Sequence, residues 1–177
     1  MPFQPGRSIF LVGPMGSGKT AVGRQLARRL GYRFVDSDAE IEQRTGVDIP
    51  FIFEKEGEAG FRLREREVID ALSGAEGIVL ATGGGAVLAG ESRQRLAARG
   101  LVVYLETSVE QQLARTRRSR NRPLLFTDDP RGRLQSLMAE REPLYRSIAS
   151  VVVRTDGRKV GSVVDEIEER LATGGAG

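Results

Sequence analysis

The chain has 177 residues, of which 40% are hydrophobic and 29% charged, a composition typical of globular proteins and not of disordered chains. Its formal net charge is +3, and arginine supplies nearly all of the positive charge, since the only lysines are Lys19, Lys55 and Lys159. Cysteine and histidine are absent, which excludes disulfides, thiolate and imidazole metal sites, and histidine-based catalytic triads.

No apolar run reaches the ~18 residues of a membrane-spanning helix, and no signal-peptide pattern opens the sequence. A chain of this length is expected to form one domain, so we predict a single domain over residues 1–177. We expect a cytoplasmic protein without membrane contact. We also expect a monomer, because the sequence shows no heptad repeat and no apolar interface stripe.

The first predicted strand leads directly into a phosphate-binding motif. Residues 8–12 are mostly apolar, as in a buried strand, and residues 13–20 read GPMGSGKT, which matches G-x-x-x-x-G-K-[ST]. Apolar residues then recur at helical spacing. In such a P-loop the backbone N–H groups and the helix N-terminus bind phosphates. Lys19 is expected to reach the β- and γ-phosphates, and the Thr20 hydroxyl to ligate Mg²⁺.

A second predicted strand, residues 32–36, ends beside two aspartates. Asp36 and Asp38 point to the same side if the chain is still extended there. Carboxylates at the C-terminal end of a strand beside a P-loop lie where ligands bind in parallel sheets. Ser37 or Asp38 is also a candidate N-cap of the following helix, so capping alone is the alternative explanation for Asp38.

Residues 41–73 are predicted to be mostly helical, with one break near residues 46–50 and another near residues 57–60, where glycine and proline occur. Within this stretch Arg62 is placed to pair with Glu65 one turn later. On the sequence alone, a solvated helix face explains this charged segment.

A third strand, residues 77–81, is followed by three consecutive glycines at positions 83–85. Such a run at the end of a strand indicates a backbone that another group approaches closely, and a flexible loop is the alternative. A short helix over residues 92–99, a strand over residues 101–105 and a helix from Val109 follow.

The segment 115–122 is rich in arginine, and Pro123 is expected to end the preceding helix at or before Arg122. In a phosphoryl-transfer domain, a mobile arginine-rich loop is typical of a lid, which we place at about residues 115–128. The alternative is a charge run that is solvated or binds nucleic acid.

The last elements are a helix over residues 131–147 that Pro143 bends or interrupts, a strand over residues 150–153, and an amphipathic helix over residues 160–171. We expect the tail, residues 173–177, to be disordered. Because strands and helices alternate along the chain, the sequence predicts an α/β fold with a parallel sheet covered by helices on both faces.

Several segments occur together in the order and spacing of one family, and over nearly the whole chain the sequence resembles shikimate kinase. They are the P-loop, Asp36-Ser37-Asp38, Phe61-Arg62 with Glu65, Gly83-Gly84-Gly85, Arg122-Pro123-Leu124-Leu125, and Arg141 within Arg-Glu-Pro-Leu-Tyr-Arg. The resemblance implies ATP-dependent phosphorylation of the 3-hydroxyl of shikimate in aromatic amino acid (chorismate) biosynthesis. It also implies a P-loop kinase-like three-layer α/β/α fold with a five-stranded parallel sheet of order 2-3-1-4-5.

The resemblance further assigns roles to residues. It implies that ATP is bound by Gly16, Ser17, Gly18, Lys19, Thr20, Ala21, Arg115, Arg122 and Arg158. It implies that shikimate is bound by Asp38, Arg62, Gly83, Gly84, Gly85 and Arg141. The implied catalytic residues are Lys19, Asp38 and Arg122, and Mg²⁺ is held by Thr20 and, through water, by Asp36.

Two alternatives differ in what they require. Another small-molecule P-loop kinase, of the gluconate or nucleoside-monophosphate type, shares the nucleotide half but does not need Arg62, the glycine run and Arg141 together. A nucleic-acid-binding protein would use the arginines of residues 115–122, but that run lacks the interleaved aromatic residues on which single strands stack. We therefore expect ATP, ADP and shikimate as partners, and no nucleic acid.

Overall fold

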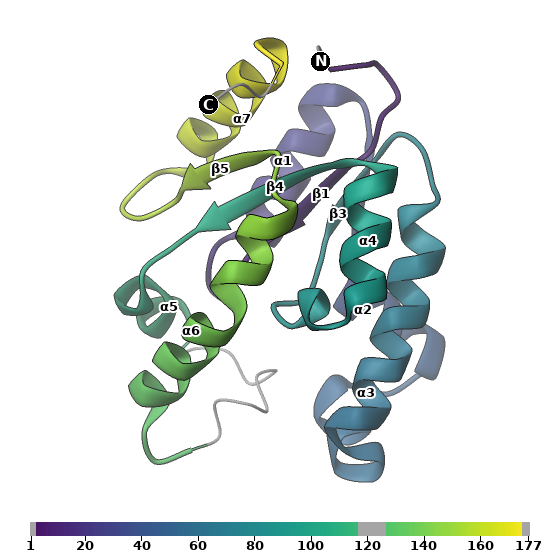
Figure 1. The fold of residues 1–177 in the computed structure, drawn as a ribbon, viewed down its shortest axis with the longest axis vertical. Helices are drawn as coiled ribbons and strands as arrows, with labels where there is room; N and C mark the ends of the chain where they lie inside the picture. Colours follow the sequence, from purple (N-terminus) through teal and green to yellow (C-terminus); the bar gives the residue numbers. More distant parts are fainter. Residues whose placement is uncertain (1–2, 117–126, 175–177) are drawn as a thin grey trace.

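The computed structural model describes residues 3–116 and 127–174, which form a parallel five-stranded sheet flanked by helices (Figure 1). The strand order is β2-β3-β1-β4-β5, as the family resemblance implied. The strands are β1 (Ile9–Val12), β2 (Arg33–Asp36), β3 (Ile78–Ala81), β4 (Leu101–Glu106) and β5 (Val151–Arg154).

Helices cover both faces of the sheet, which confirms the three-layer α/β/α class. One face carries α1 (Lys19–Leu30) and α7 (Val160–Ala172). The other carries α2 (Ser37–Thr45), α3 (Ile49–Ser73), α4 (Gly90–Arg99) and α6 (Pro130–Ile148). The short 3₁₀ helix η1 (Ala86–Leu88) follows the glycine run, and α5 (Val109–Thr116) packs against α6. No described helix is both long and apolar enough to cross a membrane.

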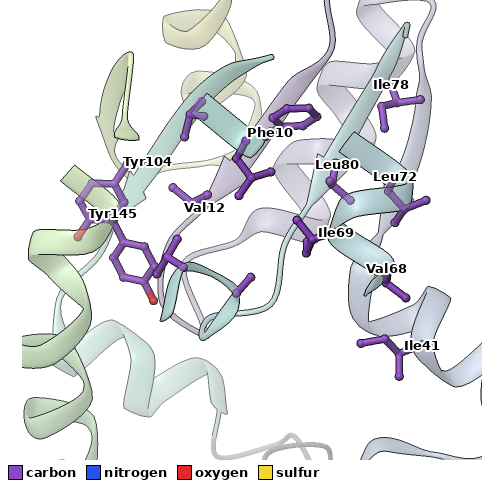
Figure 2. Close-up of a cluster of buried hydrophobic side chains, with 14 of the residues drawn as sticks. Phe10, Val12, Ile41, Val68, Ile69, Leu72, Ile78, Leu80, Tyr104 and Tyr145 are labelled. Carbon is purple, nitrogen blue, oxygen red and sulfur yellow. The ribbon is translucent and has the colours of Figure 1, made fainter. Parts of the chain in front are cut away.

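The central strand β1 shows why the strands read as continuous apolar runs. Ile9 and Leu11 join the cluster under α1 and α7, whereas Phe10 and Val12 join the cluster on the opposite face, and all four are 0% exposed. Successive side chains of a strand point to opposite faces, so a sheet covered on both sides needs an apolar residue at every position. Figure 2 shows Phe10 and Val12 on the face where Tyr145 packs.

The predicted helix breaks near residues 46–50 and 57–60 are confirmed. Helix α2 ends at Gly46, which is left-handed with φ 73°, and Pro50 stands in the first turn of α3, where a missing N–H costs nothing. Helix α3 is kinked at Gly57 (φ 71°, ψ −178°). By contrast Pro143 does not interrupt α6. Arg141 and Tyr145 on either side of it are buried, so tertiary packing holds this helix together.

Some predicted segments extend beyond what the structure describes. Of the expected lid, residues 117–126 lie outside the described residues, and with them Arg122. Of the expected tail, Thr173 and Gly174 still donate backbone hydrogen bonds to the last turn of α7, and residues 175–177 lie outside.

Candidate active site

The P-loop joins β1 to α1 by a backbone path that requires glycine. Gly13, Gly16 and Gly18 have positive φ angles of 150°, 78° and 91°. A Cβ on Gly13 would lie 2.7 Å from the carbonyl oxygen of Leu105, so a side chain is excluded there on steric grounds as well. The loop ends at the N-terminus of α1, where backbone N–H groups and the helix dipole favour a bound anion.

Lys19, the first residue of α1, lies back over this loop. Its Nζ donates to the carbonyl oxygens of Gly13 at 2.6 Å and Pro14 at 2.8 Å, and to Ser17 Oγ at 3.4 Å. These contacts hold an ammonium charge against the loop that a phosphate would enter. The position fits the function expected from the motif, because Lys19 can exchange carbonyl acceptors for phosphate oxygens.

Thr20, the second residue of α1, is hydrogen-bonded to Asp36 at the end of β2. Thr20 Oγ1 donates to Asp36 Oδ2 at 3.2 Å, and Asp36 Oδ1 accepts from the backbone N–H groups of Asp38 and Ala39 at 2.9 and 3.1 Å. Asp36 is therefore the N-cap of α2, and the prediction that Ser37 or Asp38 caps it is wrong. The reason is that β2 runs into α2 without a loop, so the last strand residue is already the cap.

The hydroxyl of Thr20 and the carboxylate of Asp36 are oxygen ligands of the kind that Mg²⁺ prefers. Among the described residues, no group of three or more acidic or other ligating side chains could hold a metal by itself. Mg²⁺ commonly takes one or two protein ligands and completes its shell with water and substrate phosphates.

A cleft of about 400 Å³ opens over these residues at the carboxyl ends of the strands. Its walls include the P-loop from Gly16 to Ala21, the ends of β2 and β3, and the loop after β5. The residues that line it and that the sequence had singled out are Gly16, Ser17, Gly18, Lys19, Thr20, Ala21, Asp36, Asp38, Gly83, Gly84, Arg115 and Arg158.

Two arginines border this cleft from different elements. Arg115, in α5, donates from Nη1 to the carbonyl oxygen of Gly16 at 3.2 Å. Arg158, in the loop before α7, is held by Glu166 at 2.7 Å and by the carbonyl oxygen of Arg154 at 2.9 Å. Both predicted arginines therefore line this cleft, and each guanidinium is held by a partner within the chain.

The glycine run is a crowded place, as the sequence indicated, and the groups that crowd it are side chains of this chain. A Cβ on Gly83 would lie 2.8 Å from Asp38 Oδ1 and 2.9 Å from Glu65 Oε2. One on Gly85 would lie 2.4 Å from Arg62 Nη1. Because these positions are glycines, side chains of α2 and α3 can lie against the backbone of the loop. Ser37 Oγ anchors this backbone by accepting a hydrogen bond from the Gly83 N–H at 3.1 Å.

Arg62 and Glu65 form a pair in this region. Arg62 Nη1 lies 2.8 Å from Glu65 Oε1, and the two side chains are only 18% and 4% exposed. The expected pairing is confirmed, but the expected solvated helix face is wrong for these two residues, because the glycine loop covers this part of α3. Burial raises the pKa of the Glu65 carboxyl, and the charge and hydrogen bond of Arg62 oppose that shift.

Arg141, in α6, lies beside Gly84. A Cβ on Gly84 would lie 3.6 Å from Arg141 Nη1. The arginine is 4% exposed, and it forms no ion pair with any carboxylate in the described part of the chain. Burial lowers its pKa, as does the charge of Arg62. A guanidinium stays charged in proteins, so a buried one without a carboxylate partner favours binding of an anion.

Comparison with known proteins identifies the family. The shikimate kinase family model matches residues 15–172. The chain belongs to the shikimate kinase family. The shikimate kinase of Halorhodospira halophila is 63% identical over 163 residues, which is 92% of each chain. That of Vibrio campbellii is 56% identical over 165 residues, covering 93% of this chain and 96% of the relative.

A solved structure agrees in fold. Shikimate kinase from Acinetobacter baumannii, in complex with shikimate, superposes with a TM-score of 0.93 at 49% identity over 95% of this chain and 94% of its own. A gluconokinase from Sinorhizobium meliloti is more distant, with a TM-score of 0.62 and 21% identity over 98% and 94% of the two chains, and shows the shared fold alone. Membership of the family makes this chain an enzyme, a kinase.

One polar residue at the site was not predicted. Tyr145 donates from its hydroxyl to the carbonyl oxygen of Gly84 at 2.5 Å. The available signal was its position four residues after Arg141, which places both on the same face of one helix. A tyrosine at that spacing is equally typical of an apolar core, so the sequence alone did not distinguish the two.

Proposed function

We propose that this chain transfers the γ-phosphoryl group of ATP to the 3-hydroxyl of shikimate, giving shikimate 3-phosphate and ADP, as a step of aromatic amino acid biosynthesis. The observation that carries the proposal is the buried guanidinium of Arg141, which forms no ion pair with a carboxylate in the described chain and lies, like Arg62, beside the glycine run. A small anionic acceptor bound there would lie beside the P-loop cleft, because Gly83 and Gly84 line both places.

In the nucleotide half, the P-loop backbone binds the phosphates, and Lys19 shifts from its loop carbonyls to the β- and γ-phosphates. When bound, Mg²⁺ supplies neutralisation of phosphate charge. Thr20 would hold it directly and Asp36 through a water. We assign Gly16, Ser17, Gly18 and Ala21 to the phosphate cradle, and Arg115 and Arg158 to the far wall of the nucleotide cleft.

In the acceptor half, each group of shikimate meets a matching one. Its carboxylate is held by Arg62 and Arg141, whose planar guanidinium groups suit a carboxylate. Its hydroxyls are held by Asp38, which also assists removal of the proton from the reacting hydroxyl. The backbone of residues 83–85 completes the pocket. Phosphoryl transfer depends on alignment and charge neutralisation, so a chain without histidine can perform it.

The remaining assignments concern the lid and the form of the protein. Arg122 lies outside the described residues, and we keep for it the catalytic and phosphate-binding role of the lid, at about residues 115–128. We propose a single domain that works as a cytoplasmic monomer and binds no nucleic acid.

A coupled assay for ADP tests the proposal. ADP should form with shikimate, ATP and Mg²⁺, and should not form when shikimate is replaced by gluconate or by a nucleoside monophosphate. Turnover with one of those acceptors at a higher kcat/KM than with shikimate would contradict it. In that case the buried Arg141 would have to serve another anion.

A further inference from the structure

Tyr145 takes no part in the function proposed above, yet it touches the acceptor site. It lies in α6, one turn after Arg141, and its side chain is 0% exposed. Its hydroxyl donates a hydrogen bond to the carbonyl oxygen of Gly84 at 2.5 Å, and the two residues are 61 positions apart in the sequence. A buried phenol that bonds to the backbone of a ligand-binding loop acts on the orientation of that loop.

The bond fixes a peptide plane as well as an atom. The described chain contains no cis peptide, so the carbonyl of Gly84 and the N–H of Gly85 point in opposite directions across one planar unit. Because Tyr145 holds the carbonyl toward α6, the N–H of Gly85 is directed away from α6. Without the hydroxyl, this glycine-rich peptide would be free to rotate.

Gly84 is also in contact with the nucleotide half. A Cβ placed on it would lie 3.4 Å from the Met15 nitrogen, 3.8 Å from the Gly13 carbonyl oxygen and 3.6 Å from Arg141 Nη1. The peptide that Tyr145 holds therefore lies close to both the P-loop and Arg141. A small rotation there would alter the distance between acceptor and phosphates.

Two features keep the phenol ready to donate. Burial raises the pKa of Tyr145 far above its usual range, although the positive charge of Arg141 opposes the shift, so the hydroxyl stays protonated. Its ring is held by Tyr104, with ring centroids 5.1 Å apart and planes at 28° (Figure 2). The position of the hydroxyl oxygen is thus limited by packing before any ligand arrives.

We propose that Tyr145 is a positioning residue for the acceptor substrate, which holds the Gly84–Gly85 peptide and Arg141 in the arrangement that binds the carboxylate. This rests on the proposed function, since it names how one part of that site is kept in place. The hydroxyl does not touch the reacting atoms and acts through the glycine loop and through Arg141, with which it also interacts.

The test is Tyr145→Phe, with Tyr104→Phe as the matched control. Both tyrosines are 0% exposed and belong to the same cluster, but the Tyr104 hydroxyl contacts Glu142 at 3.2 Å and not the glycine loop. Losing one neutral hydrogen bond and leaving a carbonyl unsatisfied should raise the KM for shikimate by about threefold to thirtyfold in Tyr145→Phe. The KM for ATP should stay at the wild-type value in both variants, and the KM for shikimate should stay so in Tyr104→Phe.

The possible outcomes separate the two proposals. If the wild-type enzyme does not phosphorylate shikimate, the proposed function is wrong. If it does, and Tyr145→Phe has the wild-type KM for shikimate, the positioning role is wrong. Equal increases of both KM values in Tyr145→Phe, or the same shikimate effect in Tyr104→Phe, would show a general structural role and would also overturn the inference. Melting temperatures of both variants confirm that folded enzymes are compared.

Discussion

Replacing Gly85 by alanine should disable the acceptor site and leave the fold intact. Gly85 has φ −98°, which alanine adopts without strain. The added Cβ would lie 2.4, 2.5 and 2.5 Å from Nη1, Cζ and Nη2 of Arg62, so the whole guanidinium would have to withdraw. Because these atoms end a flexible side chain, Arg62 yields and the backbone does not.

The size of the effect follows from that displacement. To reach a normal contact of ~3.5 Å the guanidinium of Arg62 must move by about 1 Å. A charge-assisted hydrogen bond to a carboxylate is worth about 1.5–3 kcal/mol, so losing its alignment should weaken shikimate binding about ten- to a hundredfold. Lower kcat should follow, since an error of about 1 Å in substrate placement can cost a hundredfold in rate.

Titration calorimetry with shikimate and, separately, with ADP measures both effects. Gly90→Ala is the matched control, because its new Cβ would meet only Arg93 Nη2, at an ordinary 3.5 Å. We expect ADP affinity and melting temperature to stay near wild type in both variants, and shikimate affinity to fall only in Gly85→Ala. Wild-type shikimate affinity in a folded Gly85→Ala enzyme would refute the placement of Arg62 at the carboxylate.

Three further changes probe the rest of the site. Lys19→Met should nearly abolish turnover with an unchanged circular dichroism spectrum, because the lysine contacts the P-loop and not the core; wild-type kcat would count against the P-loop assignment. Thr20→Val should raise the Mg²⁺ concentration needed for half-maximal activity, since it removes the hydroxyl that meets Asp36; an unchanged requirement, or activity in excess EDTA, would exclude that metal site. Arg141→Lys should bind shikimate about tenfold more weakly, because an ammonium lacks the planar fork of a guanidinium. The control is Arg146→Lys, at a side chain on the same helix that is 46% exposed, and it should bind shikimate normally. Equal binding by both variants would argue against a buried carboxylate site.

Features encoded by neighbouring residues were predictable from the sequence. The P-loop is a local motif whose glycines, lysine and threonine act through backbone geometry at a helix start, and its expected strand and helix are present. Strand positions such as Phe10 and Leu11 followed from apolar runs, because a sheet covered on both faces leaves no polar positions. The strand order came from the family resemblance, since periodicity does not specify which strands pair.

Features that depend on distant contacts were not predictable. Arg62 was expected on a solvated face, but a glycine loop about twenty residues later in the sequence covers most of its side chain. Tyr145 gave no sign of its bond to Gly84, because the two are brought together only by the packing of α6 on the sheet. The N-cap of α2 was misplaced by one or two residues, since nothing local shows that β2 ends without a loop.

Asp36 makes contacts with both of its carboxylate oxygens, and this limits which residues can replace it. One oxygen of Asp36 caps α2, and the other meets Thr20. Serine would preserve a cap but bring no charge toward a cation, and asparagine would cap while presenting only one acceptor oxygen. Asp48 also caps a helix, accepting from the Phe51 N–H at 2.9 Å, but has no such second partner among the described residues, so serine, threonine or asparagine should replace it with little loss. A saturation library selected for activity should therefore retain several residues at position 48 and almost only aspartate at position 36.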